Sequence, residues 1–160
     1  GYKTISGSFS HLDQKMQDLY GDEYVTRMKQ DTPSKYIETV LDVFCEDEFK
    51  VLESAHEKDI ILYDRGILDF IAYCRAKKIP VTNRLIHEAQ SADYEAAFMF
   101  HILKDIRIRN KRKSIDVNES HRIELAMRNV YSKWSVDLIE VPVMPLHERI
   151  EYIRNHLSKL

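Results

Sequence analysis

Residues 59–66 read DIILYDRG, and this stretch decides the fold predicted for the chain. Its apolar residues are continuous rather than alternating, as in a parallel strand that is covered on both faces. Asp64-Arg65-Gly66 ends the run abruptly, and residues 67–77 return to a helical spacing of apolar side chains. The stretch therefore predicts a central strand over residues 59–64, followed by a turn and a helix.

Strand-type and helix-type segments alternate on both sides of this stretch. Further strands are expected at residues 2–5, 97–103 and 137–141. Helices are expected as two short ones within 12–28 and at residues 33–57, 67–77, 84–94, 118–134 and 146–157. The polar run SGSFSH at residues 6–11 predicts a loop. Such alternation implies an α/β fold in which right-handed crossovers join parallel strands.

The helix expected over residues 33–57 has a clear start signal, because Pro33 follows Asp31 and Thr32. Its apolar side chains predict one stripe that faces the core. The stripe comprises Tyr36, Val40, Val43, Phe44, Phe49, Val51 and Leu52.

The size and charge of the chain limit its function. At 160 residues with 44% hydrophobic residues it can bury one packed core, so a single domain over residues 1–160 is expected. The net charge of -2 gives no overall field that would attract nucleic acid or an anionic membrane. The longest apolar run, residues 96–103, is shorter than the ~20 residues that cross a bilayer. Cys45 and Cys74 lack CxxC spacing and no secretory leader is seen, so reduced thiols in the cytoplasm are expected.

The best candidates for chemistry are Asp64 and Arg65. A carboxylate at the carboxyl end of a parallel strand lies on the edge where α/β sheets bind ligands, and the planar guanidinium of Arg65 suits phosphate oxygens. In the alternative, structural interpretation, Asp64 caps the next helix and Arg65 pairs with surface acids. Asp69, in the first turn of that helix, is equally open to a capping role and to ligand contact.

A cationic run, KDIRIRNKRK at residues 104–113, contains six Lys or Arg residues. Its simplest interpretation is a solvated surface loop. Because it follows a predicted strand and precedes a long helix, it is also suited to close over a phosphate-bearing ligand, as a lid of about residues 104–117. The candidate phosphate-binding residues are then Arg107, Arg109 and Arg112.

Other kinds of site find little support. A phosphate-binding loop needs GxxxxGK[ST], and the four glycines of the chain do not provide it. The seven histidines show no metal-ligand spacing, so no zinc site is expected. No Ser-His-Asp or Cys-His arrangement is suggested by spacing.

Two blocks of the sequence resemble those of a known family. DRGILDFIAYCR at residues 64–75 and VPVMPLHERIEYI at residues 141–153 are similar to the two signatures of small P-loop "predicted ATPase" proteins of the AAA-type group. These proteins are related in fold to nucleoside and nucleotide monophosphate kinases. Asn110 and Arg112 lie where the family has a lid with an Asn and a phosphate-facing Arg.

The resemblance implies a three-layer, kinase-like parallel sheet with the strand order 2-3-1-4-5. Gly1-Tyr2-Lys3-Thr4-Ile5 resembles the second strand of the family. The first strand, the P-loop and the first helix are therefore expected to precede it in a longer protein, or another segment is expected to fill their place. Residues 60–63 should then not pair directly with residues 98–102. Relatives often carry an acidic residue after the second strand, near the acceptor site, and SGSFSH has none.

The resemblance and the residues together favour an ATP-dependent phosphotransferase that acts on a nucleoside, a nucleotide or a similar small acceptor. With ATP and Mg²⁺ bound, the lysine and hydroxyl of the expected P-loop would hold the phosphates and the metal. Asp64 would orient the water shell of the metal or the acceptor hydroxyl, and Arg65 would contact phosphate. Without that P-loop, residues 1–160 alone are expected to be inactive. A non-enzymatic nucleotide-binding switch is the alternative, and it fits the missing acidic residue. Nucleic-acid binding by residues 104–113 is disfavoured, because the run lacks aromatic residues. Homo-oligomer formation is left open.

Overall fold

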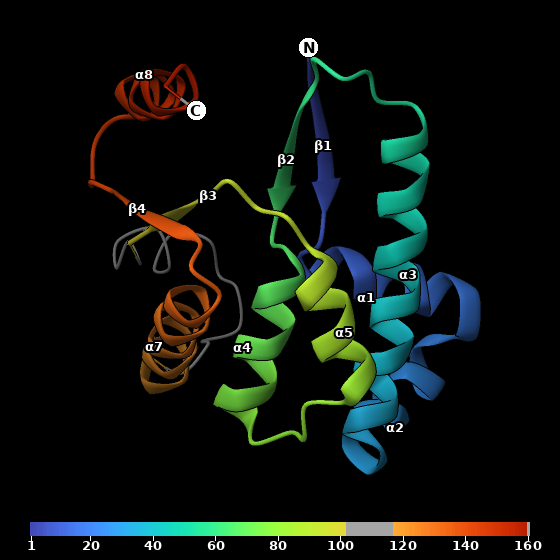
Figure 1. Cartoon of the computed structure of the whole chain (residues 1–160). Coiled ribbons are helices and arrows are strands. Elements are labelled where there is room, and N and C mark those ends of the chain that lie inside the picture. Colours follow the sequence, from blue (N-terminus) through green and yellow to red (C-terminus); the bar gives the residue numbers. More distant parts are fainter. Residues whose placement is uncertain (102–116, 160) are drawn as a thin grey trace. The chain divides into compact units, whose positions relative to one another are not determined.

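The computed structural model describes residues 1–101 and 117–159 (Figure 1). The chain forms two compact units, Gly1–Ala92 and Asp93–Leu160, and each is described by itself. Each unit combines a pair of parallel strands with helices, which confirms the α/β class. That both units belong to one domain stays a prediction. None of the described helices is long and apolar enough to cross a membrane.

Unit 1 (Gly1–Ala92) is built on two parallel strands, β1 (Tyr2–Ser6) and β2 (Ile60–Asp64). In the register of the pair Ser6 is opposite Asp64, so both strands end at the same edge. The helices of the unit are α1 (Phe9–Tyr20), α2 (Asp22–Asp31), α3 (Pro33–Glu53), α4 (Ile67–Lys77) and α5 (Asn83–Ser91). Figure 1 shows α3 running alongside β1.

An aromatic cluster joins the elements of unit 1. The ring of Phe44 on α3 packs edge-on against that of Phe70 on α4, with 5.3 Å between ring centroids, and both side chains are fully buried. Phe9 on α1 packs against Phe70 and lies 4.2 Å from the ring of Tyr73. The ring of Tyr63 on β2 lies 6.4 Å from that of Phe44. Because buried rings contribute strongly to stability, this cluster fixes three helices against β2.

Unit 2 (Asp93–Leu160) has a similar plan. Its elements are β3 (Ala96–Phe100), α7 (Val117–Lys133), β4 (Asp137–Val141) and α8 (Leu146–Leu157), and β3 and β4 are parallel. Both terminal nitrogens of Arg128 on α7 bond the carboxylate of Glu140 on β4, and one of them also bonds Glu124. This guanidinium joins the helix to the strand and holds the pKa of Glu140 below its ordinary value.

The strand pairs agree with the neighbours expected for the order 2-3-1-4-5. In that order the second strand lies beside the third and the fourth beside the fifth, as β1 lies beside β2 and β3 beside β4. The order of one whole sheet stays a prediction. The central position of β2 also stays a prediction. A central strand is paired on both sides and covered on both faces, whereas in the described part of the chain β2 pairs with β1 and the side chains of residues 60–63 are half-buried.

Several predicted boundaries were wrong. The helix predicted over residues 84–94 is α5, which ends at Ser91, and the strand predicted over residues 97–103 is β3, which spans Ala96–Phe100. α1 begins at Phe9, inside the loop predicted over residues 6–11, because Phe9 packs on α4 and helical bonds start at Ser8. α3 ends at Glu53 rather than near residue 57.

The predicted inward stripe of α3 holds only for the first half of the helix. Its buried members are Tyr36, Val40, Val43 and Phe44. The predictions for Phe49 and Leu52 were wrong, since these side chains are 65% and 46% exposed. Phe49 comes five residues after Phe44, which turns it about 140° away from that side chain. The last turns of α3 therefore extend past the buried core.

Both cysteines are free thiols, Cys45 half-buried and Cys74 buried. Burial raises the pKa of each from 9.0 to about 11. Because the thiolate is the reactive form, its fraction at about pH 8 should be about 100-fold smaller than for an unshifted thiol. We therefore expect iodoacetamide to label the folded protein far more slowly than the urea-unfolded protein, as followed by mass spectrometry. Equal labelling rates for the two forms would contradict this prediction.

Candidate functional site

The carboxyl ends of β1 and β2 meet at one edge of unit 1. β2 ends at Asp64, α4 begins at Ile67, and the two are connected by Arg65 and Gly66. The backbone N–H of Gly7, just after β1, donates to the backbone carbonyl of Asp64 at 2.8 Å. Asp64 is exposed at this edge, which is where open α/β sheets bind their ligands.

Arg65 has an unusual backbone conformation. Its φ of 74° lies in the left-handed region, which is costly for a residue other than glycine. Its side chain is 48% exposed, and its Nη1 lies 3.4 Å from Oδ1 of Asp69. Strain of this kind persists where the surrounding structure holds it, and it is concentrated at functional sites. The Asp64–Gly66 turn thus keeps a guanidinium close to the end of β2.

Asp69 holds this turn from the helix side. Its side chain is 9% exposed, and its Oδ2 accepts the backbone N–H of Gly66 at 2.8 Å. In return the N–H of Asp69 donates to the carbonyl of Gly66 at 3.0 Å. These two bonds close the first turn of α4, where a carboxylate also complements the helix dipole. The carboxylate that caps α4 is therefore that of Asp69 and not that of Asp64. A ligand contact by Asp69 stays a prediction.

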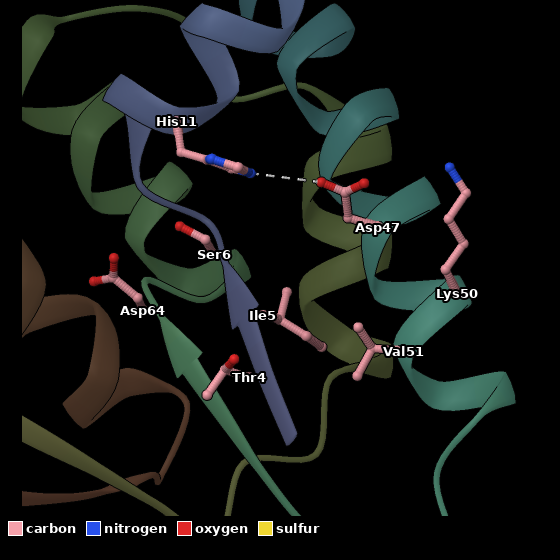
Figure 2. A pocket seen from close by; sticks show the side chains of 8 residues that line it. All are labelled: Thr4, Ile5, Ser6, His11, Asp47, Lys50, Val51 and Asp64. Atoms are coloured by element: carbon pink, nitrogen blue, oxygen red, sulfur yellow. Dashed lines mark ion pairs between the residues drawn. The ribbon is translucent and has the colours of Figure 1, made fainter. Parts of the chain in front are cut away.

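A hollow of about 460 Å³ opens at the same edge (Figure 2). Its volume is within the range of small-molecule sites. Four elements supply its lining: Thr4, Ile5 and Ser6 from β1, His11 from α1, Asp47, Lys50 and Val51 from α3, and Asp64 from β2. The hollow thus combines hydroxyl groups, carboxylates, an imidazole and one lysine with two aliphatic side chains.

One wall of the hollow carries a histidine and a carboxylate that face each other. Nε2 of His11 lies 4.0 Å from Oδ2 of Asp47, as the dashed line in Figure 2 shows. Asp47 also binds Lys15, whose Nζ lies 2.5 Å from both carboxylate oxygens. The side chain of Asp47 is 19% exposed and that of His11 is 44% exposed. Because His11 belongs to α1 and Asp47 to α3, the packing of these helices sets their separation.

The structure brings three of the residues predicted from sequence together. Asp64 lines the hollow, Arg65 follows it in the turn, and Asp69 binds both the turn and Arg65. The remaining candidates, Arg107, Arg109 and Arg112, lie outside the described residues, as do residues 104–116 of the predicted lid.

His11 and Asp47 were missed by the sequence analysis. They stand far apart in the sequence, and the histidines of the chain show no ligand spacing. The one local signal was the place of His11 at the end of SGSFSH, directly after the predicted second strand. Asp47 gave no signal, because it is one of several acids on a long helix and its position in the hollow follows from tertiary packing.

The donors at this edge fit a magnesium ion that keeps most of its waters. Asp64 offers one exposed carboxylate, and Mg²⁺ in phosphoryl-transfer sites is bound by one or two carboxylates together with waters and phosphates. Within residues 1–101 and 117–159, no group of three or more His, Cys, Asp or Glu side chains is arranged to hold a metal ion. That Asp64 holds such an ion through its water shell stays a prediction. The guanidinium of Arg65 fits phosphate oxygens.

A family model described as "AAA domain" matches residues 13–149, which is most of the chain. Neither the curated proteins nor the solved structures gave a significant match. AAA-type domains are P-loop NTPase-like and generally bind a nucleotide with Mg²⁺, so the match agrees with the sequence resemblance at this level and supports a nucleotide-binding, ATPase-like function. The chain belongs to this family of AAA domains.

Proposed function

We propose that the protein is an ATP-dependent phosphotransferase that uses Mg²⁺ and acts on a small acceptor. The observation that carries this proposal is the end of β2, where the exposed carboxylate of Asp64 opens onto the hollow and Arg65 follows in a strained turn. Phosphoryl transfer requires little covalent chemistry from the protein and depends on charges that are held in position. A fixed carboxylate and a fixed guanidinium beside a hollow of small-molecule size are suited to that task.

Asp64 and Arg65 have complementary roles in this proposal. ATP, when bound, supplies the phosphoryl group, and Mg²⁺ neutralises part of its charge. Asp64 holds the water shell of the ion or orients the acceptor hydroxyl from the rim of the hollow. Arg65 offers positive charge to phosphate oxygens, and its contact with Asp69 at 3.4 Å limits its movement. On sequence grounds the proposal also includes Arg107, Arg109 and Arg112 as phosphate contacts.

A nucleotide-binding switch without catalysis is the rival function. The sequence favoured the switch because residues 6–11, which follow β1, contain no acidic residue. Ser6 and His11 of this segment line the hollow, and Asp47 on α3 supplies a carboxylate to the same hollow. Because Asp47 offers an acid on this side of the site, the missing acidic residue in residues 6–11 no longer favours the switch.

Product analysis by ³¹P NMR distinguishes the two functions. The purified full-length protein is incubated with Mg²⁺-ATP and a set of nucleosides, nucleoside monophosphates and sugars. We expect ADP and a new resonance from a phosphorylated acceptor. In the control, EDTA removes Mg²⁺ and should stop the reaction, because the charge on the transferring group is no longer neutralised. Slow release of inorganic phosphate alone would support the switch instead.

A further inference from the structure

We propose that the acceptor is an uncharged compound with a hydroxyl group, and that His11 takes the proton of this hydroxyl while Asp47 orients the imidazole. The inference rests on the proposed phosphotransferase function and assigns the acceptor side of the same site. It starts from one juxtaposition, since the facing His11 and Asp47 line the same hollow as Asp64.

The start of α1 fixes His11 on the wall of the hollow. The carbonyl of Ser8 accepts the backbone N–H groups of His11 and Leu12, both at 3.0 Å, and these bonds close the first turn. Leu12 is fully buried and anchors that turn. The imidazole itself is 44% exposed, so a ligand in the hollow can reach it although its backbone is held.

Asp47 is suited to position this imidazole. Its carboxylate is bound at 2.5 Å by the ammonium of Lys15, which fixes its orientation, and one of its oxygens lies 4.0 Å from Nε2 of His11. At 4.0 Å the separation is too long for a hydrogen bond, so Asp47 acts on the ring through its charge. Nδ1, the nitrogen that does not face this carboxylate, is assigned as the proton acceptor. The imidazolium that forms is stabilised by the adjacent carboxylate.

The charged groups that line the hollow beside His11, or bind its lining, come from three elements. They are Lys15 on α1, Asp47 and Lys50 on α3, and Asp64 on β2, whereas β1 contributes hydroxyl and aliphatic side chains. The ammonium of Lys50 lies 2.5 Å from Glu46, and Figure 2 shows it pointing away from the other lining side chains. Both lysines are thus already paired with carboxylates, Lys15 with Asp47 and Lys50 with Glu46.

This distribution of charge favours an uncharged acceptor. Asp47 and Asp64 both line the hollow, and the lining described here contains no arginine. A phosphate on the acceptor would bring further negative charge next to these carboxylates, with no guanidinium in the lining to bind it. A hydroxyl group can instead bond to a carboxylate, to the imidazole or to the hydroxyls of Thr4 and Ser6. The lining therefore selects against nucleotides and other phosphate esters as acceptors.

The chemical step is a balanced group transfer. The oxygen of the acceptor hydroxyl forms a bond to the γ-phosphorus of ATP, and the bond from that phosphorus to the β–γ bridging oxygen breaks. ADP leaves with the electron pair of the broken bond. The hydroxyl proton passes to Nδ1 of His11 and from there to water. Nothing is oxidised or reduced, and ATP is the one co-reactant.

The substitution His11→Gln tests this assignment, because it removes the proton acceptor and keeps a polar side chain. We expect kcat with a nucleoside or sugar acceptor to fall about 100-fold, while ATP binding measured by calorimetry is unchanged. KM for the acceptor should change little, because the substitution removes proton transfer and not binding. The matched control is His87→Gln on α5, an exposed histidine outside the hollow, which should keep both kcat and KM.

A second variant, Asp47→Asn, tests the positioning role. It should lower kcat less than His11→Gln does and leave KM for the acceptor unchanged, because the imidazolium that forms during transfer loses its neighbouring charge. An unchanged kcat in Asp47→Asn would overturn the positioning role.

Each remaining outcome bears on a different claim. If the wild-type protein does not bind ATP, the phosphotransferase function itself is wrong. If ATP is bound and its phosphoryl group transferred, but His11→Gln matches wild type in kcat, only the role of His11 is wrong. If nucleoside monophosphates become diphosphates while nucleosides and sugars are not phosphorylated, the uncharged acceptor is wrong.

Discussion

Asparagine in place of Asp64 is expected to lower the rate of phosphoryl transfer from ATP about 10³-fold, the upper end of the effect of removing one preorganised polar group. Asparagine keeps the shape of the side chain but loses the negative charge that the proposal assigns to the water shell of Mg²⁺ or to the acceptor hydroxyl. The measurement is the initial rate of ADP formation with a phosphorylated acceptor, at saturating Mg²⁺-ATP.

The substitution Asp64→Asn should leave the fold intact. Residue 64 is exposed, and the bond that ties it to β1 runs from the N–H of Gly7 to its backbone carbonyl, which asparagine retains. The capping carboxylate of α4 belongs to Asp69 and is also retained. The melting temperature should therefore stay close to that of wild type, so that a lower rate reports on chemistry. An Asp64→Asn protein with the wild-type rate would exclude the proposed role.

A matched control for this substitution is Asp18→Asn. Asp18 is exposed on α1 and accepts a hydrogen bond from Gln14 at 3.0 Å, but it does not line the hollow. It changes the net charge of the protein by the same amount as Asp64→Asn. Its rate should therefore equal that of wild type, which separates a local effect of Asp64 from a general effect of charge.

The sequence predicted the regular elements well because their signals are local. α4 occupies Ile67–Lys77 and β4 occupies Asp137–Val141, as the spacing of apolar residues indicated. Parallel pairing followed from the alternation of strands and helices, and both strand pairs are parallel.

Features set by contacts between distant residues could not be predicted in this way. α1 begins at Phe9 because its ring packs on Phe70 and Tyr73, which come much later in the chain. His11 and Asp47 face each other because α1 packs on α3. The left-handed φ of Arg65 could not be predicted either, because arginine has no preference for that region.

The block at residues 64–75 that pointed to the AAA-type family forms one continuous piece of structure, the turn after β2 and the first turns of α4. Asp69 closes the first turn of α4 on Gly66 and contacts Arg65. Tyr73, one turn further along, packs against Phe9 at the start of α1. The block therefore builds the turn beside Asp64 and also anchors the helix that carries His11, which links the two halves of the candidate site.

Alanine in place of Gly7 is expected to lower the free energy of unfolding by about 3 kcal/mol, the upper end of the cost of overpacking. A Cβ atom at this position would lie 2.2 Å from the backbone carbonyl oxygen of Arg65 and 2.9 Å from Cε2 of Phe44. Neither neighbour can easily yield, because one is backbone in a strained turn and the other belongs to a fully buried ring. The measurement is urea unfolding followed by circular dichroism.

The matched control is Gly21→Ala, which makes the same chemical change where space is open. No atom lies within 4 Å of a Cβ built at Gly21, and its φ of 87° means that alanine there meets only backbone strain of about 1 kcal/mol. The φ of Gly7 is not in the left-handed region, so alanine at this position is disfavoured by lack of space and not by backbone strain. Because the N–H of Gly7 binds the carbonyl of Asp64, Gly7→Ala should also slow phosphoryl transfer, whereas Gly21→Ala should not. Equal stability of Gly7→Ala and wild type would show that β1 and the Asp64–Gly66 turn do not approach so closely, and the candidate site would lose its connection to β1.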